Sequence, residues 1–339
     1  MDTGPGRLMA AVNIVNCVLL CMLAGQAAAH HHKAAPAAAH QQKVAPPPLP
    51  PAVGVTCETN YNFTENDRVI IQGALNLEYL EAEYFLWAAY GYGLDELYPG
   101  MSEGGPPPMG VRKANLGPYY DDLFMQLGQQ EVGHLRIIKG SIGAEYDIPR
   151  PLMNLSTEMF GRAMNMAVGQ ELNPPFDPFA NSLNYLLSAF SIPHVGLATY
   201  VGASENIIGS SAVLLLSKIL AVESAQDAII RNELYRRKDE KVEPYDYTTA
   251  EFTTFIANMS NSLAGQIVNE GIVVPEAQGA EGKITGNVVA ADGDSASFAS
   301  NPREFLAILY MTGDAALPGG YYPDGCLGVT AEGFLNGQN

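Results

Sequence analysis

The amino-acid sequence predicts an all-α protein built on a four-helix bundle, with a fifth helix and an irregular C-terminal tail. Apolar residues recur at helical spacing in four long segments, at about 66–92, 118–141, 179–203 and 211–238. The connection between the second and third segments is long, and the other two connections are short. One long crossover therefore joins the second helix to the third, a connectivity found in one class of four-helix bundles.

Local signals set the limits of the first two helices. In the first, Leu75 and Phe85 fall on one apolar stripe. A Gly/Pro-rich loop follows, and Pro118 favours the start of the second helix because proline fits the first helical turn. The second helix is expected to stop near Gly143.

The long crossover is rich in proline between residues 149 and 178. The third helix then contains Pro193 in its interior, where a proline should kink it. A fifth helix is expected over about 249–270 and a short one over about 302–311. We therefore expect a helical domain over residues 61–270 and a C-terminal extension, residues 271–339, packed on it.

The N-terminus has the pattern of a cleaved secretion signal. Arg7 precedes an apolar run, and Ala27-Ala28-Ala29 matches an A-x-A cleavage site. Residues 1–29 are thus predicted to be a signal peptide, and the protein is predicted to be secreted. The alternative is a membrane anchor, but the run is shorter than the roughly 20 residues that span a bilayer, and no later segment is expected to span one.

Residues 30–60 are rich in Ala, Pro and His, a composition that cannot bury a core, so we expect a disordered linker. Its His30-His31-His32 tract either is simply solvated or binds Zn²⁺ or Cu²⁺ weakly.

The charge balance is strongly acidic. The chain has 18 Lys and Arg against 36 Asp and Glu, a net charge of −18. A nucleic-acid partner needs a basic face to neutralise phosphates, so this class of function is excluded. The acidity favours solubility, and attraction of cations is the alternative interpretation.

Secretion also bears on the cysteines and the sequons. Removal of the signal leaves Cys57 and Cys326, which predicts one disulfide, with two buried free thiols as the alternative. Three sequons begin at Asn62, Asn154 and Asn258 and predict a glycoprotein.

Carboxylates and one imidazole interrupt the inward apolar stripes. Glu131 and His134 are three residues apart in the second helix, and Glu223 interrupts the fourth helix in the same way. Glu78 and Glu81 do so in the first. Burial of such groups costs several kcal/mol unless they are paired or bind a cation. A di-metal carboxylate bundle needs a Glu from each of two helices and a Glu-x-x-His from each of the other two, and this chain supplies one such motif in full.

Several segments together resemble the plant desiccation-related proteins, which have a ferritin-like domain. The resemblance covers about residues 66–323 and rests on Asn76–Phe85, Gln130–Leu135, Pro193–Leu197, Tyr200–Ala203, Glu223–Ala228 and Pro302–Pro323. It implies a ferritin-like bundle, accumulation in the cell wall or apoplast during dehydration, and a metal site at Glu78, Glu81, Glu131, His134 and Glu223.

The sequence departs from metal-binding relatives at two positions. Gln226 stands where the second Glu-x-x-His would have its histidine, and a neutral amide is a poor metal ligand. Ser191–His194 stands where the third helix of the relatives has a glutamate. His194 is a weak substitute ligand, with a hydrogen-bonded core histidine as the alternative. The expected site is therefore degenerate, holding at most one divalent metal, Fe or Mn.

Three functions remain open at this point. The first is a non-enzymatic secreted stress protein, in which the cluster is a polar network. The second is a metal-dependent oxidoreductase. The third is a metal-free enzyme in which Glu131 or His134 acts as a general base on an apolar metabolite inside the bundle. The expected partners are a small apolar ligand at most, with no nucleic acid and no membrane span.

Overall fold

The computed structural model describes residues 61–266 and 270–338. The predicted signal peptide, the predicted linker and Cys57 lie outside the described residues. The described residues form part of one compact unit, residues 48–339. They contain helices and a few isolated β-bridges, without a β-strand, so the all-α prediction is confirmed for this part of the chain.

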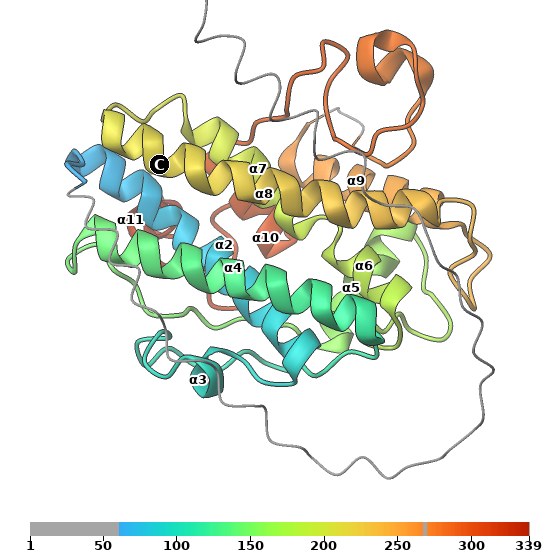
Figure 1. Ribbon diagram of the computed structural model, residues 1–339, viewed down its shortest axis with the longest axis horizontal. Helices are drawn as coiled ribbons and strands as arrows, with labels where there is room; N and C mark the ends of the chain where they lie inside the picture. The colour runs from blue at the N-terminus through green and yellow to red at the C-terminus, as the bar shows by residue number, and fades with distance from the viewer. Residues whose placement is uncertain (1–60, 267–269, 339) are drawn as a thin grey trace, which may run out of the picture. The chain divides into compact units, whose positions relative to one another are not determined.

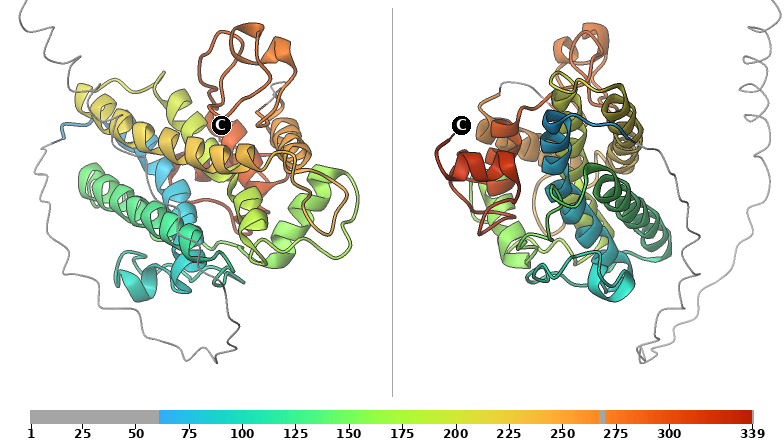
Figure 2. Two further views of the ribbon diagram at one scale, coloured as in Figure 1. Left: turned by 45° about the vertical axis from the view of Figure 1, so that its right-hand side comes forward. Right: turned by 90° about the vertical axis from the view of Figure 1, so that its left-hand side faces the viewer.

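Four helical segments surround the centre of the unit (Figures 1 and 2). Helix α2 (Glu65–Tyr90) packs along α4 (Pro118–Ile142). Helix α7 (Ile192–Ala203) packs on α8 (Ser210–Arg236) and also contacts α2. These segments correspond to the four long helices that the apolar periodicity predicts.

Six shorter helices complete the described fold. Bounds are Leu94–Leu97 for α3, Thr157–Val168 for α5, Ser182–Ala189 for α6, Thr249–Ala264 for α9, Pro302–Tyr310 for α10 and Val329–Leu335 for α11. Two 3₁₀ turns, η2 (Glu276–Gln278) and η3 (Ala280–Gly282), lie in the irregular segment after α9.

Local chemistry explains where α2 and α4 begin and end. Thr64 and Asp67 form a capping box at the start of α2, which satisfies backbone donors that have no helical partner. Gly91 ends α2 with φ 76°, a conformation that glycine adopts without a steric penalty. Pro118 starts α4, as its position in the sequence predicts.

The third helix differs from its prediction. Instead of one kinked helix over 179–203, the structure has α6 and α7, which are separated at Phe190 and Ser191. Pro193 lies in the first turn of α7, where its missing N–H costs no helical hydrogen bond. By length and composition alone Ser182–Ala203 could cross a membrane, contrary to the expectation for this segment, but 72% of its most apolar window is buried inside the protein, as in a core helix.

Helix α5 lies in what the sequence predicts to be an irregular crossover. Ser156 caps it by accepting from the backbone N–H of Met159 at 3.2 Å. Its inner face buries Phe160, whose ring stacks on Tyr84 of α2 at 5.1 Å between centroids. The prolines on both sides of α5 indicated a loop. The segment between them nevertheless has a capping residue and apolar residues at helical spacing, which fit a helix.

The C-terminal segment packs on α2 through side-chain amides. Asn76 exchanges two hydrogen bonds of 2.9 Å with the backbone of Leu327, and Gln72 accepts from Val329 N at 2.8 Å. Both amides are buried, so these bonds fix the segment in register on the helix. The boundary expected at residue 271 stays a prediction.

The predicted disulfide can be measured directly. Cys326 is buried at the C-terminal end, and no disulfide is present among the described residues. We expect Cys326 to pair with Cys57, stabilising the fold by about 3–5 kcal/mol through the long loop that it closes. Non-reducing mass spectrometry of the purified protein should show the cross-linked peptide. Two thiols that react with an alkylating reagent after denaturation without reductant would contradict the pairing.

The three predicted glycosylation sites differ in exposure. Asn62 and Asn258 are exposed, whereas Asn154 is half-buried and its backbone N–H donates to Tyr321 O at 2.8 Å. Glycosylation stays a prediction, with Asn154 the least accessible of the three.

Candidate metal centre

Three carboxylates converge on one imidazole at the centre of the bundle. His134 Nδ1 lies 3.0 Å from Glu78 Oε2, 3.0 Å from Glu131 Oε2 and 3.2 Å from Glu223 Oε1. The four side chains come from α2, α4 and α8, and each offers a ligand atom within 4.8 Å of the others. All four are buried, so water does not satisfy them.

Glu81 adds a fourth carboxylate one helical turn after Glu78. Both of its oxygens are buried, and neither has a hydrogen-bond partner among the described groups. A Cβ at Gly196 of α7 would lie 3.3 Å from Glu81 Oε1 and 3.2 Å from Glu223 Oε2. The glycine therefore leaves room for both carboxylates at the position where α7 approaches the centre.

Two further side chains donate hydrogen bonds to carboxylates of the cluster and add no ligand atom to it. Gln226 donates through Nε2 to Glu131 Oε1, and its own Oε1 has no partner among the described groups. Tyr200 of α7 donates its hydroxyl to Glu78 Oε1. Sequence reasoning did not give Tyr200 a role here. Its one signal is that a phenol inside an apolar helix needs a hydrogen-bond partner.

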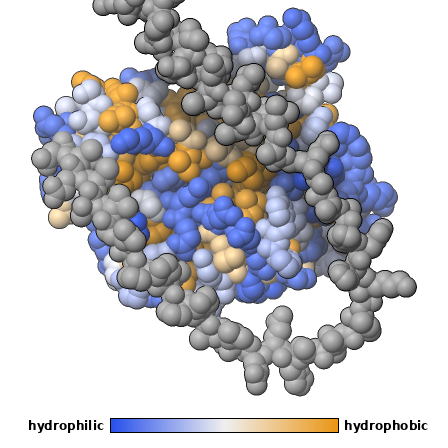
Figure 3. Space-filling model, viewed as in Figure 1, coloured by the Kyte–Doolittle hydropathy of each residue, from blue (hydrophilic) through white to orange (hydrophobic). Residues whose placement is uncertain are grey.

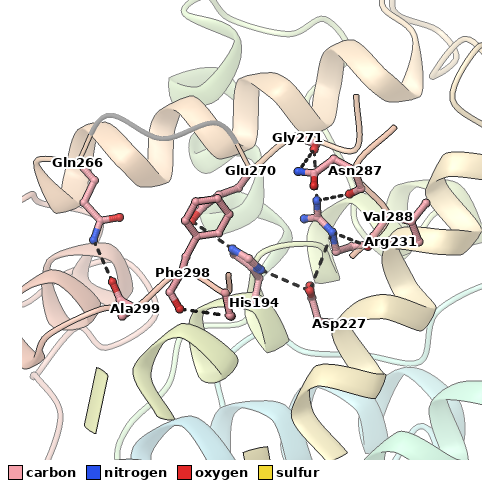
Figure 4. A network of polar contacts seen from close by, with 11 residues as sticks. His194, Asp227, Arg231, Gln266, Glu270, Gly271, Asn287, Val288, Phe298 and Ala299 are labelled. Atoms are coloured by element: carbon pink, nitrogen blue, oxygen red, sulfur yellow. Dashed lines mark hydrogen bonds and ion pairs between the residues drawn. The ribbon is translucent and has the colours of Figure 1, made fainter. Parts of the chain in front are cut away.

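His194 lies in a different network (Figure 4). Its Nδ1 is 3.4 Å from Asp227 Oδ2 and its Nε2 is 3.2 Å from Glu270 Oε1. Burial alone would lower the pKa of His194, but the charges of Glu270 and Asp227 outweigh burial and raise it to about 9. His194 is not in the central cluster, so its predicted weak role as a ligand has no support in the geometry.

Arg231 anchors this second network. Its fully buried guanidinium donates to Val288 O at 3.0 Å and Asn287 O at 2.7 Å. It also lies 3.9 Å from Asp227 Oδ2. The network thus joins α7 and α8 to the segment that follows α9 (Figure 4), a role that spacing in the sequence did not reveal.

The pKa values of the buried carboxylates show that several acidic groups lie close together in the central cluster. Burial raises the pKa of Glu81 well above its usual value, and the charges of Glu223 and Glu131 raise it further. Burial and the nearby Glu223 also raise the pKa of Glu131. Burial is again the first cause at Glu223, raising its pKa to about 7. Without a cation, the cluster therefore retains protons that an exposed carboxylate would lose.

His134 and Glu78 behave as an ion pair inside this cluster. Burial opposes the charge on each. The charges of Glu78 and Glu131 nevertheless raise the pKa of His134 far above its usual value, and the charge of His134 holds the pKa of Glu78 below its usual value. One imidazolium balances one carboxylate, and the raised pKa values of the others mean that protons, or a bound cation, must offset their charge.

These residues fit a bound cation. Among the described residues, no Lys or Arg forms an ion pair with any of the four buried carboxylates, and buried oxygens of Glu81 and Glu223 lack hydrogen-bond donors. A divalent ion would supply the missing charge, and a set of carboxylate oxygens with one imidazole suits iron or manganese.

The fold and this cluster define a ferritin-like protein with a carboxylate–histidine centre. Residues 66–236 match the model of the ferritin-like domain family. The chain belongs to this family and, by its relatives, to the plant desiccation-related ferritin-like proteins.

Two curated relatives are similar over most of their length. The chain is 43% identical to ferritin-like catalase Nec2 of Nesocodon mauritianus, over 83% of this chain and 89% of the relative. It is 45% identical to desiccation-related protein PCC13-62 of Craterostigma plantagineum, over 76% of this chain and 82% of the relative. No solved structure matches it.

Proposed function

We propose that the protein is a secreted, stress-related ferritin-like protein that holds one divalent cation, iron or manganese, at a degenerate two-ion site and does not turn over a substrate. The observation that carries this proposal is the set of four buried carboxylates beside a single imidazole, which form no ion pair with Lys or Arg among the described residues and, without a cation, retain protons. Glu78, Glu131, His134 and Glu223 would hold the ion, with Glu81 as a further oxygen donor.

The chain's own residues orient and enclose this centre. Gln226 holds one oxygen of Glu131, and Tyr200 holds one oxygen of Glu78, so each carboxylate keeps its other oxygen directed at His134. Such outer hydrogen bonds fix the orientation of ligands. A bound iron or manganese ion would supply Lewis acidity and one-electron redox chemistry.

A second candidate function is the disproportionation of hydrogen peroxide to water and O₂. The 43% identity to a relative named as a ferritin-like catalase favours it. A phenol hydroxyl also stands beside the carboxylates, because Tyr200 bonds to Glu78. Against it stands Gln226, which removes one of the imidazoles of a complete two-ion site.

Turnover separates the two candidates. We expect the metal-loaded mature protein to release O₂ from hydrogen peroxide, and to oxidise Fe²⁺ in air, no faster than the same amount of free metal, because one ion lacks the second ion that shares the charge in two-ion sites. An oxygen electrode measures the first rate, and absorbance of Fe³⁺ measures the second.

The matched controls are His134→Ala, in the cluster, and His194→Ala, outside it. Peroxide turnover that disappears in His134→Ala and persists in His194→Ala would establish the catalase candidate and end the non-enzymatic proposal. A rate equally low in all three proteins supports the proposal.

A further inference from the structure

A cavity of about 340 Å³ lies beside the candidate metal centre. Its walls come from α2, α7, α8 and α11 and from residues 299–305, which include the start of α10. Ligand pockets in proteins typically measure about 300–1,000 Å³, so the cavity can hold a small molecule. On the face seen in Figure 3, hydrophobic residues are interspersed with hydrophilic ones.

Tyr200 connects the cavity with the carboxylate cluster. The residue lines the cavity, while its hydroxyl donates to Glu78 Oε1. Tyr200 itself is buried, so its ring separates the cavity from the cluster. A molecule in the cavity would thus lie one side chain away from the candidate metal ligands.

The lining indicates what kind of molecule fits. Ile71, Leu216 and Phe305 contribute apolar surface that is favourably covered by an apolar ligand. Thr199 also lines the cavity, but its hydroxyl oxygen is buried and out of reach of a bound molecule, so the apolar side chains dominate the contact.

The charged residues around the cavity limit the kind of ligand further. The described lining includes Glu205 and Glu304 but no Lys, Arg or His. The carboxylate cluster adds negative charge behind Tyr200. Anionic ligands would meet repulsion with no compensating cation in the wall, so the charge disfavours an anion, while the apolar side chains of the lining favour an uncharged molecule.

We propose that this cavity is a binding site for a neutral, mostly apolar small molecule, whose body lies against Tyr200 and the apolar side chains of the wall. The proposal goes beyond the metal-holding function and does not depend on it, because binding requires the cavity walls and not the ion.

A pair of fluorescent probes tests the charge and apolar requirements together. N-phenyl-1-naphthylamine is neutral and carries one N–H, and 1-anilinonaphthalene-8-sulfonate is the same ring system with a sulfonate added. Titration of the mature protein should show saturable binding of the neutral probe at one site and binding of the sulfonate at least about tenfold weaker, a difference of about 1.4 kcal/mol.

Filling the cavity should abolish this binding without loss of the fold. Gly73 lines the cavity in α2, and a Cβ built there meets no heavy atom within 4 Å. Gly73→Leu should place a side chain in the open space and improve helix propensity, so we expect at least about a tenfold loss of affinity for the neutral probe and an unchanged or higher melting temperature. Gly140→Leu is the matched control, because Gly140 is also a helical glycine with no atom within 4 Å of its Cβ position but lies outside the cavity.

A further variant keeps the test decisive. Ala331→Leu fills the same cavity from α11 and replaces Gly73→Leu if that variant does not fold. The proposal is overturned if the neutral probe shows no saturable binding, if the sulfonate binds as tightly, or if the cavity-filling variants bind the neutral probe as well as Gly140→Leu.

Discussion

The mature protein is expected to retain about one tightly held iron or manganese ion per chain and no second one, because the centre offers only part of the ligand set that two ions require. His134 is the single imidazole of the cluster. Gln226 presents only an amide oxygen to a second ion, since its nitrogen donates to Glu131. An amide oxygen brings no charge to compensate a second cation.

Metal analysis of a protein in which His30, His31, His32 and His40 are replaced by glutamine measures this occupancy without the histidines of the tail. His134→Ala should lower the affinity at least about 100-fold, because it removes the one imidazole donor. His194→Ala should keep full occupancy, since His194 pairs with Asp227 and Glu270 outside the cluster. Two tightly held ions in the unsubstituted cluster would contradict the one-ion site.

The reverse substitution tests whether the ancestral geometry persists. Gln226 is buried beside Glu131, three residues after Glu223, so Gln226→His would complete a second Glu-x-x-His motif on α8. An increase in affinity or in the number of bound ions would show that only the missing imidazole limits the site. Unchanged binding would mean that Gln226 is not at a ligand position.

The bundle and the central cluster could be predicted because their signals are local and periodic. Glu78, Glu131 and Glu223 interrupt apolar stripes, and a helix places residues at such spacing on one face. Since buried carboxylates need partners, the stripes also indicated that these side chains face one another. The sequence does not show which residues of neighbouring helices are in contact. Gly196 and Tyr200 were therefore recognised as part of the site only from the structure.

The parts that sequence reasoning missed depend on tertiary contacts. Prolines near α5 suggested an irregular crossover, but Phe160 is held in the core by stacking on Tyr84. His194 follows a proline in an apolar segment, and its partner Glu270 lies beyond Ala264, where α9 ends, although the sequence predicts a helix over about 249–270. A one-dimensional pattern does not determine which distant carboxylate reaches a buried histidine, because packing decides it.

The second large effect is expected from Arg231, whose removal should destabilise the fold by about 3–5 kcal/mol. The guanidinium is 0% exposed, lies 3.9 Å from Asp227 and packs 5.0 Å from the centre of the Phe190 ring. Arg231→Ala would leave Asp227 without this cation and the carbonyls of Asn287 and Val288 without these donors. It would also open a cavity in a closely packed region.

Arg236→Ala is the matched control on the same helix. Its side chain is 68% exposed and pairs with Glu233 at 3.4 Å, a surface ion pair worth about 1 kcal/mol or less. Urea unfolding at constant pH, with the slope and the midpoint both fitted, gives the two free energies of unfolding.

A second measurement separates local from global effects of the Arg231 substitution. Because Arg231 holds the backbone at residues 287 and 288, its loss should also make the segment after α9 more susceptible to limited proteolysis under native conditions. A loss below about 1 kcal/mol in Arg231→Ala, with unchanged proteolysis, would show that the buried network in Figure 4 does not hold this segment on α8.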